Sequence, residues 1–199
     1  DGDGKADLVV ADHNNNRVSI FRNTSTAVGN INFASRVVFT TGNSPISIAI
    51  GDLDKDGKSD LATSNLTDNS VSVLRNTSLG VGNINFSNSV NYPTGSNPYS
   101  VKIGDIDADG KLDLAVTNYN SNSISIFKNT TVNVGTINFS SRLDYPAGVN
   151  PNSIAIGDID GDGKVDLGTT NWGNNNISIL KNTGAVGSIS YASKVDFSV

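Results

Sequence analysis

The sequence repeats itself with a period of 53 residues, and this period restricts the possible folds more than any other feature of the chain. Two sets of positions carry the repeat: four aspartates, and four asparagines that each precede a threonine. They are Asp7, Asp60, Asp113 and Asp166, and Asn23, Asn76, Asn129 and Asn182. An array of similar units is typical of solenoids and propellers, in which each unit buries its apolar face against the next.

Each copy contains four short segments that alternate apolar and polar residues, the pattern of half-buried strands. In the second copy these are residues 46–50, 61–64, 71–74 and 90–92. Almost no helix is expected, because glutamate, glutamine and methionine are absent while β-branched residues, Asn and Gly dominate. We therefore predict an all-β fold, a β-propeller segment built of four-stranded antiparallel blades. A β-solenoid is the competing architecture, although its rungs are usually shorter.

The repeat divides the chain into a single propeller segment, residues 1–199, with copies at 1–44, 45–97, 98–150 and 151–199. The first copy lacks the segment that would form its first strand. The chain also opens on Asp1 and not on Met, which fits a processed protein, a fragment or an excerpt. An incomplete ring has two open ends, so we expect the remaining blades of a ring, or another copy, to cover them.

The acidic residues are concentrated in a few places. All 19 are aspartates, and 15 of them fall in four short clusters, one in each copy. Outside the clusters 9 basic residues face only 4 acidic ones, so the acidity is local and does not belong to the general surface. Carboxylates crowded in this way repel one another unless a cation is present. Solvated acidic turns without a metal are the simpler alternative.

Three of the clusters have the form D-x-D-x-D-G-x-x-D, and we number the positions of this aspartate loop 1 to 9. Ca²⁺ takes six to eight oxygen ligands, and carboxylates at alternate positions of a turning chain can converge on one ion while the glycine permits the bend. Positions 1, 3, 5 and 9 are expected to supply carboxylates, and position 7 its backbone carbonyl, with the lysine ammonium pointing away. The predicted calcium ligands are Asp52, Asp54, Asp56, Lys58 and Asp60; Asp105, Asp107, Asp109, Lys111 and Asp113; and Asp158, Asp160, Asp162, Lys164 and Asp166.

The first copy holds a shortened version of the same loop, with Asp1, Asp3, Lys5 and Asp7 at positions 3, 5, 7 and 9. An EF-hand does not fit any of the four loops. That motif requires a bidentate glutamate at position 12 and flanking helices, and position 12 here lies inside an expected strand, as at Thr63.

An aspartate loop between two short strands, repeated with an intervening strand that ends near Asn-Thr, resembles the FG-GAP or VCBS-type repeat of integrin α-subunits and of many bacterial surface and secreted proteins. The similarity covers the whole chain. It implies that each calcium loop joins the innermost strand of a blade to the second, that seven blades usually close the ring, and that ligands bind on the face opposite the calcium loops.

One position changes sharply between copies while its neighbours stay nearly constant. His13, Leu66, Tyr119 and Trp172 occupy it, in the turn after the second expected strand. One interpretation is a ligand surface, where aromatic rings stack on a glycan or contact a protein partner. The other is a turn that packs against the adjacent blade, and the sequence alone does not separate the two.

Several functional classes have little support in the residues. With one histidine, no cysteine and no glutamate, the chain offers few general acids or bases, so we do not expect an enzyme. Phosphate-binding glycine loops, basic nucleic-acid patches and apolar membrane spans are also missing from the sequence.

The hypothesis is a calcium-binding propeller module, secreted or at the cell surface, that mediates adhesion or ligand binding. The alternatives are an accessory portion of a secreted enzyme, such as a polysaccharide-degrading one, and a purely structural repeat.

Overall fold

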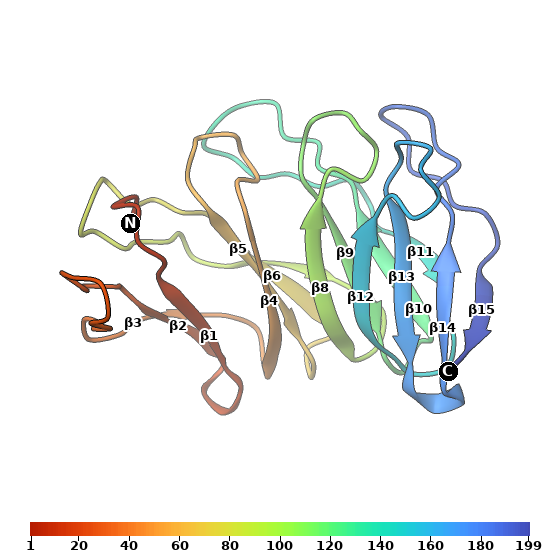
Figure 1. The fold of residues 1–199 in the computed structure, drawn as a ribbon, viewed down its shortest axis with the longest axis horizontal. Helices are drawn as coiled ribbons and strands as arrows, with labels where there is room; N and C mark the ends of the chain where they lie inside the picture. Colours follow the sequence, from red (N-terminus) through yellow and green to blue (C-terminus); the bar gives the residue numbers. More distant parts are fainter.

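A computed structural model describes residues 1–199 as four small antiparallel sheets that stand side by side, here called blades 1 to 4 (Figure 1). Blade 1 has three strands, and each of the other blades has four in the order of the chain. Blade 1 contains β1 (Leu8–Asp12), β2 (Arg17–Phe21) and β3 (Val37–Thr40). Blade 2 contains β4 (Pro45–Gly51), β5 (Asp60–Asn65), β6 (Ser70–Leu74) and β7 (Val90–Pro93).

Blades 3 and 4 repeat the same meander. Blade 3 contains β8 (Pro98–Gly104), β9 (Asp113–Asn118), β10 (Ser123–Phe127) and β11 (Leu143–Pro146). Blade 4 contains β12 (Pro151–Gly157), β13 (Asp166–Asn171), β14 (Asn176–Leu180) and β15 (Val195–Ser198). The only helices are two single 3₁₀ turns, η1 (His13–Asn15) and η2 (Trp172–Asn174), and neither is long enough to cross a bilayer.

The first strands of successive blades lie against one another, so that β4, β8 and β12 form the inner row of the array (Figure 1). Each of β8 and β12 also contacts the second strand of the preceding blade. The β-ladders stay within a blade, and the strands of neighbouring blades are in contact without forming a ladder. This arrangement confirms the predicted all-β propeller segment and excludes a solenoid, in which strands pair from one rung to the next.

The apolar core lies between blades and not inside any one of them. One cluster joins Leu53 and Val73 of blade 2 to Leu114 and Phe127 of blade 3, and a second cluster joins blade 3 to blade 4 in the same way. Two faces of the array have no neighbour in this chain. There, apolar side chains such as Leu8 of blade 1 and Ile159 of blade 4 are exposed.

Two connections of each blade matter for the site. The aspartate loop joins the first strand to the second, and a long loop joins the third strand to the fourth. The long loops span residues 22–36, 75–89, 128–142 and 181–194. Because the strands run antiparallel, both connections emerge at the same end of the blade, and the turn between the second and third strands emerges at the opposite end (Figure 1).

Candidate metal centre

The β-ladder of each blade closes its aspartate loop. Asp60, at loop position 9, is the first residue of β5 and pairs with Gly51, the last residue of β4. The intervening residues must therefore turn sharply, and Gly57 at position 6 has a φ of +83°, which glycine adopts without strain. Blades 3 and 4 have the same pairing and the same turn, at Gly104 with Asp113 and at Gly157 with Asp166.

The turn gathers three of the predicted ligands in each complete loop. Carboxylate oxygens of positions 1, 3 and 9 lie within 4.8 Å of one another in all three loops. The three groups are Asp52, Asp54 and Asp60; Asp105, Asp107 and Asp113; and Asp158, Asp160 and Asp166. The fourth predicted carboxylate, at position 5, lies outside this group and accepts a hydrogen bond from the backbone of position 7, as Asp56 does from Lys58 N at 2.9 Å.

The position 9 carboxylate is held by the fold itself. Asp113 is buried, and its two oxygens accept hydrogen bonds from Ile106 N at 3.0 Å and from Asn129 N at 2.7 Å. Asp60 is held in the same way by the backbone of the loop and of Asn76. Burial raises the pKa of Asp60 and that of Asp113 to about 6, because a buried carboxyl disfavours its charged form.

In blade 3, the carboxylate at position 1 provides an acceptor that no group of the chain satisfies. Asp105 Oδ2 accepts a hydrogen bond from Gly110 N at 2.9 Å, whereas Asp105 Oδ1 is buried and has no hydrogen-bond partner. A buried acceptor without a partner costs roughly 1–3 kcal/mol, more for a charged group. This oxygen, together with the neighbouring carboxylates, forms an all-oxygen donor set, which is the set that Ca²⁺ requires.

The two oxygens of the position 3 carboxylate have separate partners. Asp54 Oδ1 accepts a hydrogen bond from Asp56 N within the loop at 3.1 Å. Asp54 Oδ2 accepts two hydrogen bonds from outside the loop, from Arg75 Nε at 2.7 Å and from Gly135 N at 2.8 Å. Gly135 belongs to the long loop of blade 3, so the aspartate loop of one blade is in direct contact with the next blade.

The basic partner of position 3 recurs in every blade, and it was missed in the sequence. In each of the four copies this basic residue directly precedes the Asn-Thr pair and contacts the position 3 carboxylate. The four residues are Arg22, Arg75, Lys128 and Lys181. The hydrogen bond to Asp54 raises the pKa of Arg75, and the one from Lys181 lowers the pKa of Asp160. The recurrence of a basic residue at the 53-residue step was the available signal.

The expected direction of the position 7 lysines is wrong in two of the three complete loops. Lys58 Nζ lies 3.6 Å from Asp56 Oδ2, and Lys111 Nζ lies 3.5 Å from Asp109 Oδ2. In blade 1, Lys5 Nζ lies 3.8 Å from Asp3 Oδ2. The ammonium groups therefore turn back to the loop, because the position 5 carboxylate is the nearest negative charge and is not in the group formed by positions 1, 3 and 9.

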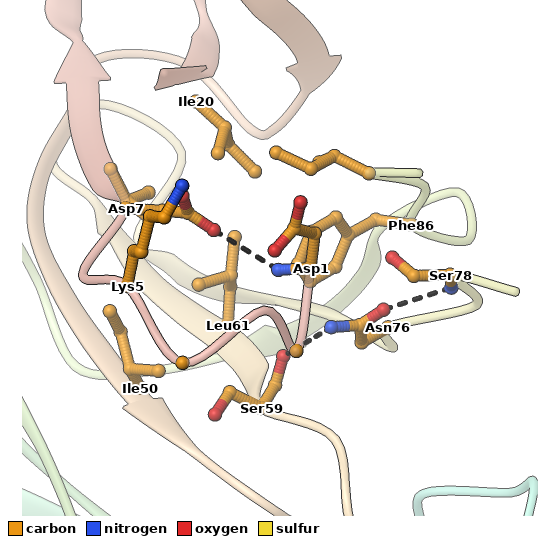
Figure 2. Close-up of a pocket in the computed structure, with 14 residues that line it drawn as sticks. Asp1, Lys5, Asp7, Ile20, Ile50, Ser59, Leu61, Asn76, Ser78 and Phe86 are labelled. Atoms are coloured by element: carbon orange, nitrogen blue, oxygen red, sulfur yellow. Dashed lines mark hydrogen bonds and ion pairs between the residues drawn. The ribbon is translucent and has the colours of Figure 1, made fainter. Parts of the chain in front are cut away.

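The shortened loop of blade 1 stands beside a cavity of about 350 Å³ (Figure 2). Asp7 Oδ2 accepts a hydrogen bond from the terminal ammonium of Asp1 at 3.0 Å, and Lys5 lies nearby. Apolar side chains from blades 1 and 2, including Ile20 and Phe86, line the rest of the cavity. The residues equivalent to Ile20 and Phe86 in the next copy pack around the buried Leu53, at the junction between blades 2 and 3.

The variable position lies at the end of the blades opposite the aspartate loops (Figure 1). Trp172 is 64% exposed, and Tyr119 is half-buried with its ring centroid 5.6 Å from that of Tyr99. Both rings are thus at least partly accessible to solvent. Of the other two side chains, His13 is exposed and Leu66 is half-buried.

The backbone at the variable position takes part in contacts between blades. Leu66 O accepts a hydrogen bond at 3.1 Å from Asn97 Nδ2, in the connection that leads into blade 3, and Tyr119 O accepts one at 3.1 Å from Asn150 Nδ2, in the connection that leads into blade 4. The main chain therefore has the packing role of the second interpretation, as does the His13 ring, whose Nδ1 lies 3.3 Å from Pro45 O of blade 2, while the rings of Tyr119 and Trp172 remain accessible. This separation explains how one turn can keep its shape and still vary in its side chain.

Comparison with solved structures supports the architecture. The chain is similar to the BBS1N chain of the complex described as BBS1N with ARL6DN, at 15% identity and a TM-score of 0.58, over 98% of this chain and 53% of that one. It is also similar to a Bacteroides fragilis protein described as a candidate 6-phosphogluconolactonase, at 16% identity and a TM-score of 0.60, over 96% of this chain and 55% of that one. The chain thus spans about half the length of both, and likeness at this identity shows the fold alone.

Comparison with protein families is more specific. No curated protein sequence matches the chain significantly. The model of the FG-GAP-like repeat, however, matches residues 1–63, 58–116 and 105–169, which include all four aspartate loops. Repeats of this kind are typical of extracellular proteins, often bind calcium, and generally form propeller domains that are not catalytic. The chain belongs to the FG-GAP-like repeat family.

Proposed function

We propose that this chain is a calcium-binding propeller module of a secreted or cell-surface protein, and that it mediates adhesion or ligand binding without catalysis. The observation that carries the calcium site is the convergence of three carboxylates within 4.8 Å in each of three loops. Like charges so close together are unfavourable without a cation. The unpartnered Asp105 Oδ1 supports the same reading, because it is a ligand atom that no group of the protein uses.

The donor set favours calcium over other common cations. Every candidate side-chain ligand is a carboxylate, and the chain offers no cysteine and only one histidine, His13, which lies at the other end of its blade. Soft metals prefer thiolate or imidazole ligands, whereas Ca²⁺ accepts a flexible shell of six to eight oxygens. Mg²⁺ demands near-ideal octahedral geometry and retains most of its water.

The residues of the chain would hold the ion as follows. Asp52, Asp54 and Asp60 are already gathered, and the carboxylate of Asp56 and the carbonyl of Lys58 lie on the same turn. A bound ion would supply positive charge to this cluster and tie the end of β4 to the start of β5. The site is therefore proposed to be structural, holding the first two strands of each blade at the correct spacing.

The adhesion or ligand-binding role rests on the face opposite the aspartate loops. There the exposed Trp172 and the half-buried Tyr119 offer aromatic surface to a glycan or a protein partner. A role without catalysis is supported by the isolation of His13 from the aspartate loops and by the use of the aspartates in metal binding.

Isothermal titration calorimetry tests the calcium site. We expect three ions to bind to the complete loops with dissociation constants of about 10⁻⁴ to 10⁻³ M, the range of extracellular calcium modules, and Mg²⁺ to bind more weakly. The double variant Asp105→Asn and Asp107→Asn should lose one of these ions, whereas Asp68→Asn, which lies outside the loops, should lose none. Absence of calcium binding by the unmodified chain would refute the proposal.

A further inference from the structure

Each aspartate loop faces a basic side chain that its own blade supplies, 21 residues after position 3 in every copy. Arg75 contacts two carboxylates of the blade 2 loop, with Nε 2.7 Å from Asp54 Oδ2 and Nη2 3.5 Å from Asp56 Oδ2. Lys128 in blade 3 and Lys181 in blade 4 contact the same two loop positions. The arrangement therefore belongs to the repeat and not to one blade.

Burial explains why the loop needs this charge. The side chain of Asp54 is fully buried, whereas that of Arg75 keeps 27% of its surface exposed. A buried carboxylate without a partner is costly, so a cation that reaches it from the surface stabilises the loop in the absence of metal. A long flexible side chain can do this while its charged head stays partly in water.

The same charge has the opposite effect on a bound calcium ion. At about 5 Å a unit positive charge repels a divalent cation enough to weaken its binding roughly tenfold or more, even at the dielectric constant of water. Against this, a partner that orients a metal ligand can strengthen metal binding by about 10- to 100-fold. The two effects act in opposite directions, and the contacts of the carboxylate determine which of them is larger.

In blade 2 the orienting effect does not depend on Arg75. Asp54 Oδ2 also accepts a hydrogen bond from Gly135 N at 2.8 Å, and Asp54 Oδ1 accepts one from Asp56 N at 3.1 Å. Both of these bonds remain when the guanidinium is removed, so the carboxylate keeps its direction. Repulsion is then the larger consequence of the charge.

We propose that Arg75 is an internal counter-cation, which neutralises the aspartate loop when calcium is absent and lowers the calcium affinity of the same loop. This inference rests on the proposed calcium-binding function. Lys128, Lys181 and Arg22 contact the equivalent carboxylates in blades 3, 4 and 1. Arg75 thus stabilises the aspartate loop of its own blade at low calcium, at the expense of weaker binding at high calcium.

The test compares Arg75→Met with the unmodified 199-residue chain, using calcium calorimetry and thermal unfolding in a chelator. We expect one of the calcium sites to become about tenfold tighter, so that the titration separates into a tight step of one ion and a weaker step for the others. In chelator, the melting temperature of Arg75→Met should fall. If Arg75→Met does not fold, Arg75→Gln removes the charge and retains a hydrogen-bond donor, and the same two results are expected.

Two further variants serve as controls. Lys102→Met removes an exposed charge of β8 that has no carboxylate partner, and it should change neither measurement. Arg75→Lys keeps the charge and should bind calcium like the unmodified chain. If the unmodified chain binds calcium while Arg75→Met binds it equally or more weakly, this proposal fails and the proposed function stands. If the unmodified chain binds no calcium, both fail.

Discussion

Ile106 and Ile159 occupy the same position in two aspartate loops but have different surroundings, and replacing each by alanine tests whether the core lies between blades. Ile106 is 1% exposed and packs among residues of blades 3 and 4, including Leu167 and Leu180. Ile159, in blade 4, has no following blade in this chain and is 57% exposed. The two substitutions remove the same atoms, so they differ only in what surrounds the side chain.

The expected magnitudes differ widely. Ile106→Ala removes three buried carbons at about 0.8 kcal/mol each and leaves a cavity, so the free energy of unfolding should fall by about 3 kcal/mol. Ile159→Ala should change it by no more than about 0.5 kcal/mol, as for other exposed positions. Urea unfolding of the two variants and the unmodified chain, at one fixed calcium concentration and followed by circular dichroism, measures both values. Equal losses in the two variants would refute an inter-blade core.

Three further predictions follow from the site and the opposite face. Addition of a chelator should lower the melting temperature, because each site at a calcium concentration tenfold above its dissociation constant adds about 1.4 kcal/mol; an unchanged transition would count against structural calcium. Calcium affinity should fall as the pH is lowered from 7 to 5. The pKa values of Asp60 and Asp113 are raised to about 6, so at pH 5 these carboxylates carry protons that calcium must displace, and calorimetry at the two pH values should show tighter binding at pH 7. Replacement of Tyr119 and Trp172 by alanine should reduce binding to a glycan or protein ligand found by array screening, while calcium uptake stays unchanged; loss of both would indicate damage to the fold instead.

The strands could be predicted from the sequence because their signal is local. Residues 46–50 and 71–74 alternate apolar and polar side chains, and they lie within β4 and β6. The aspartate loop is also local, since Gly51 and Asp60 are only nine residues apart and the ladder between β4 and β5 brings their neighbours together. A sequence pattern whose residues all lie within one hairpin can therefore be recognised before the fold is known.

The contacts around the loop could not be predicted in the same way. Arg75 reaches Asp54 across 21 residues and Gly135 reaches it across 81, so both contacts depend on how the blades twist and stack. The direction of Lys58 was wrong for a related reason: it was inferred from a metal-bound loop, whereas the ammonium follows the nearest negative charge, that of Asp56. Only the regular recurrence of a basic residue before Asn76 and its equivalents indicated that the position had a role.

The central claim is that the aspartate loops bind calcium, and a crystal structure of the chain grown in millimolar calcium tests it most directly. We expect one ion in each complete loop, with oxygens of Asp105, Asp107, Asp109 and Asp113 and the carbonyl of Lys111 at about 2.3–2.6 Å in the loop of blade 3. The ion should give an anomalous signal, and Asp105 Oδ1 should be among its ligands. Loops without an ion at this concentration, or an octahedral ion with distances of about 2.1 Å, would contradict the account.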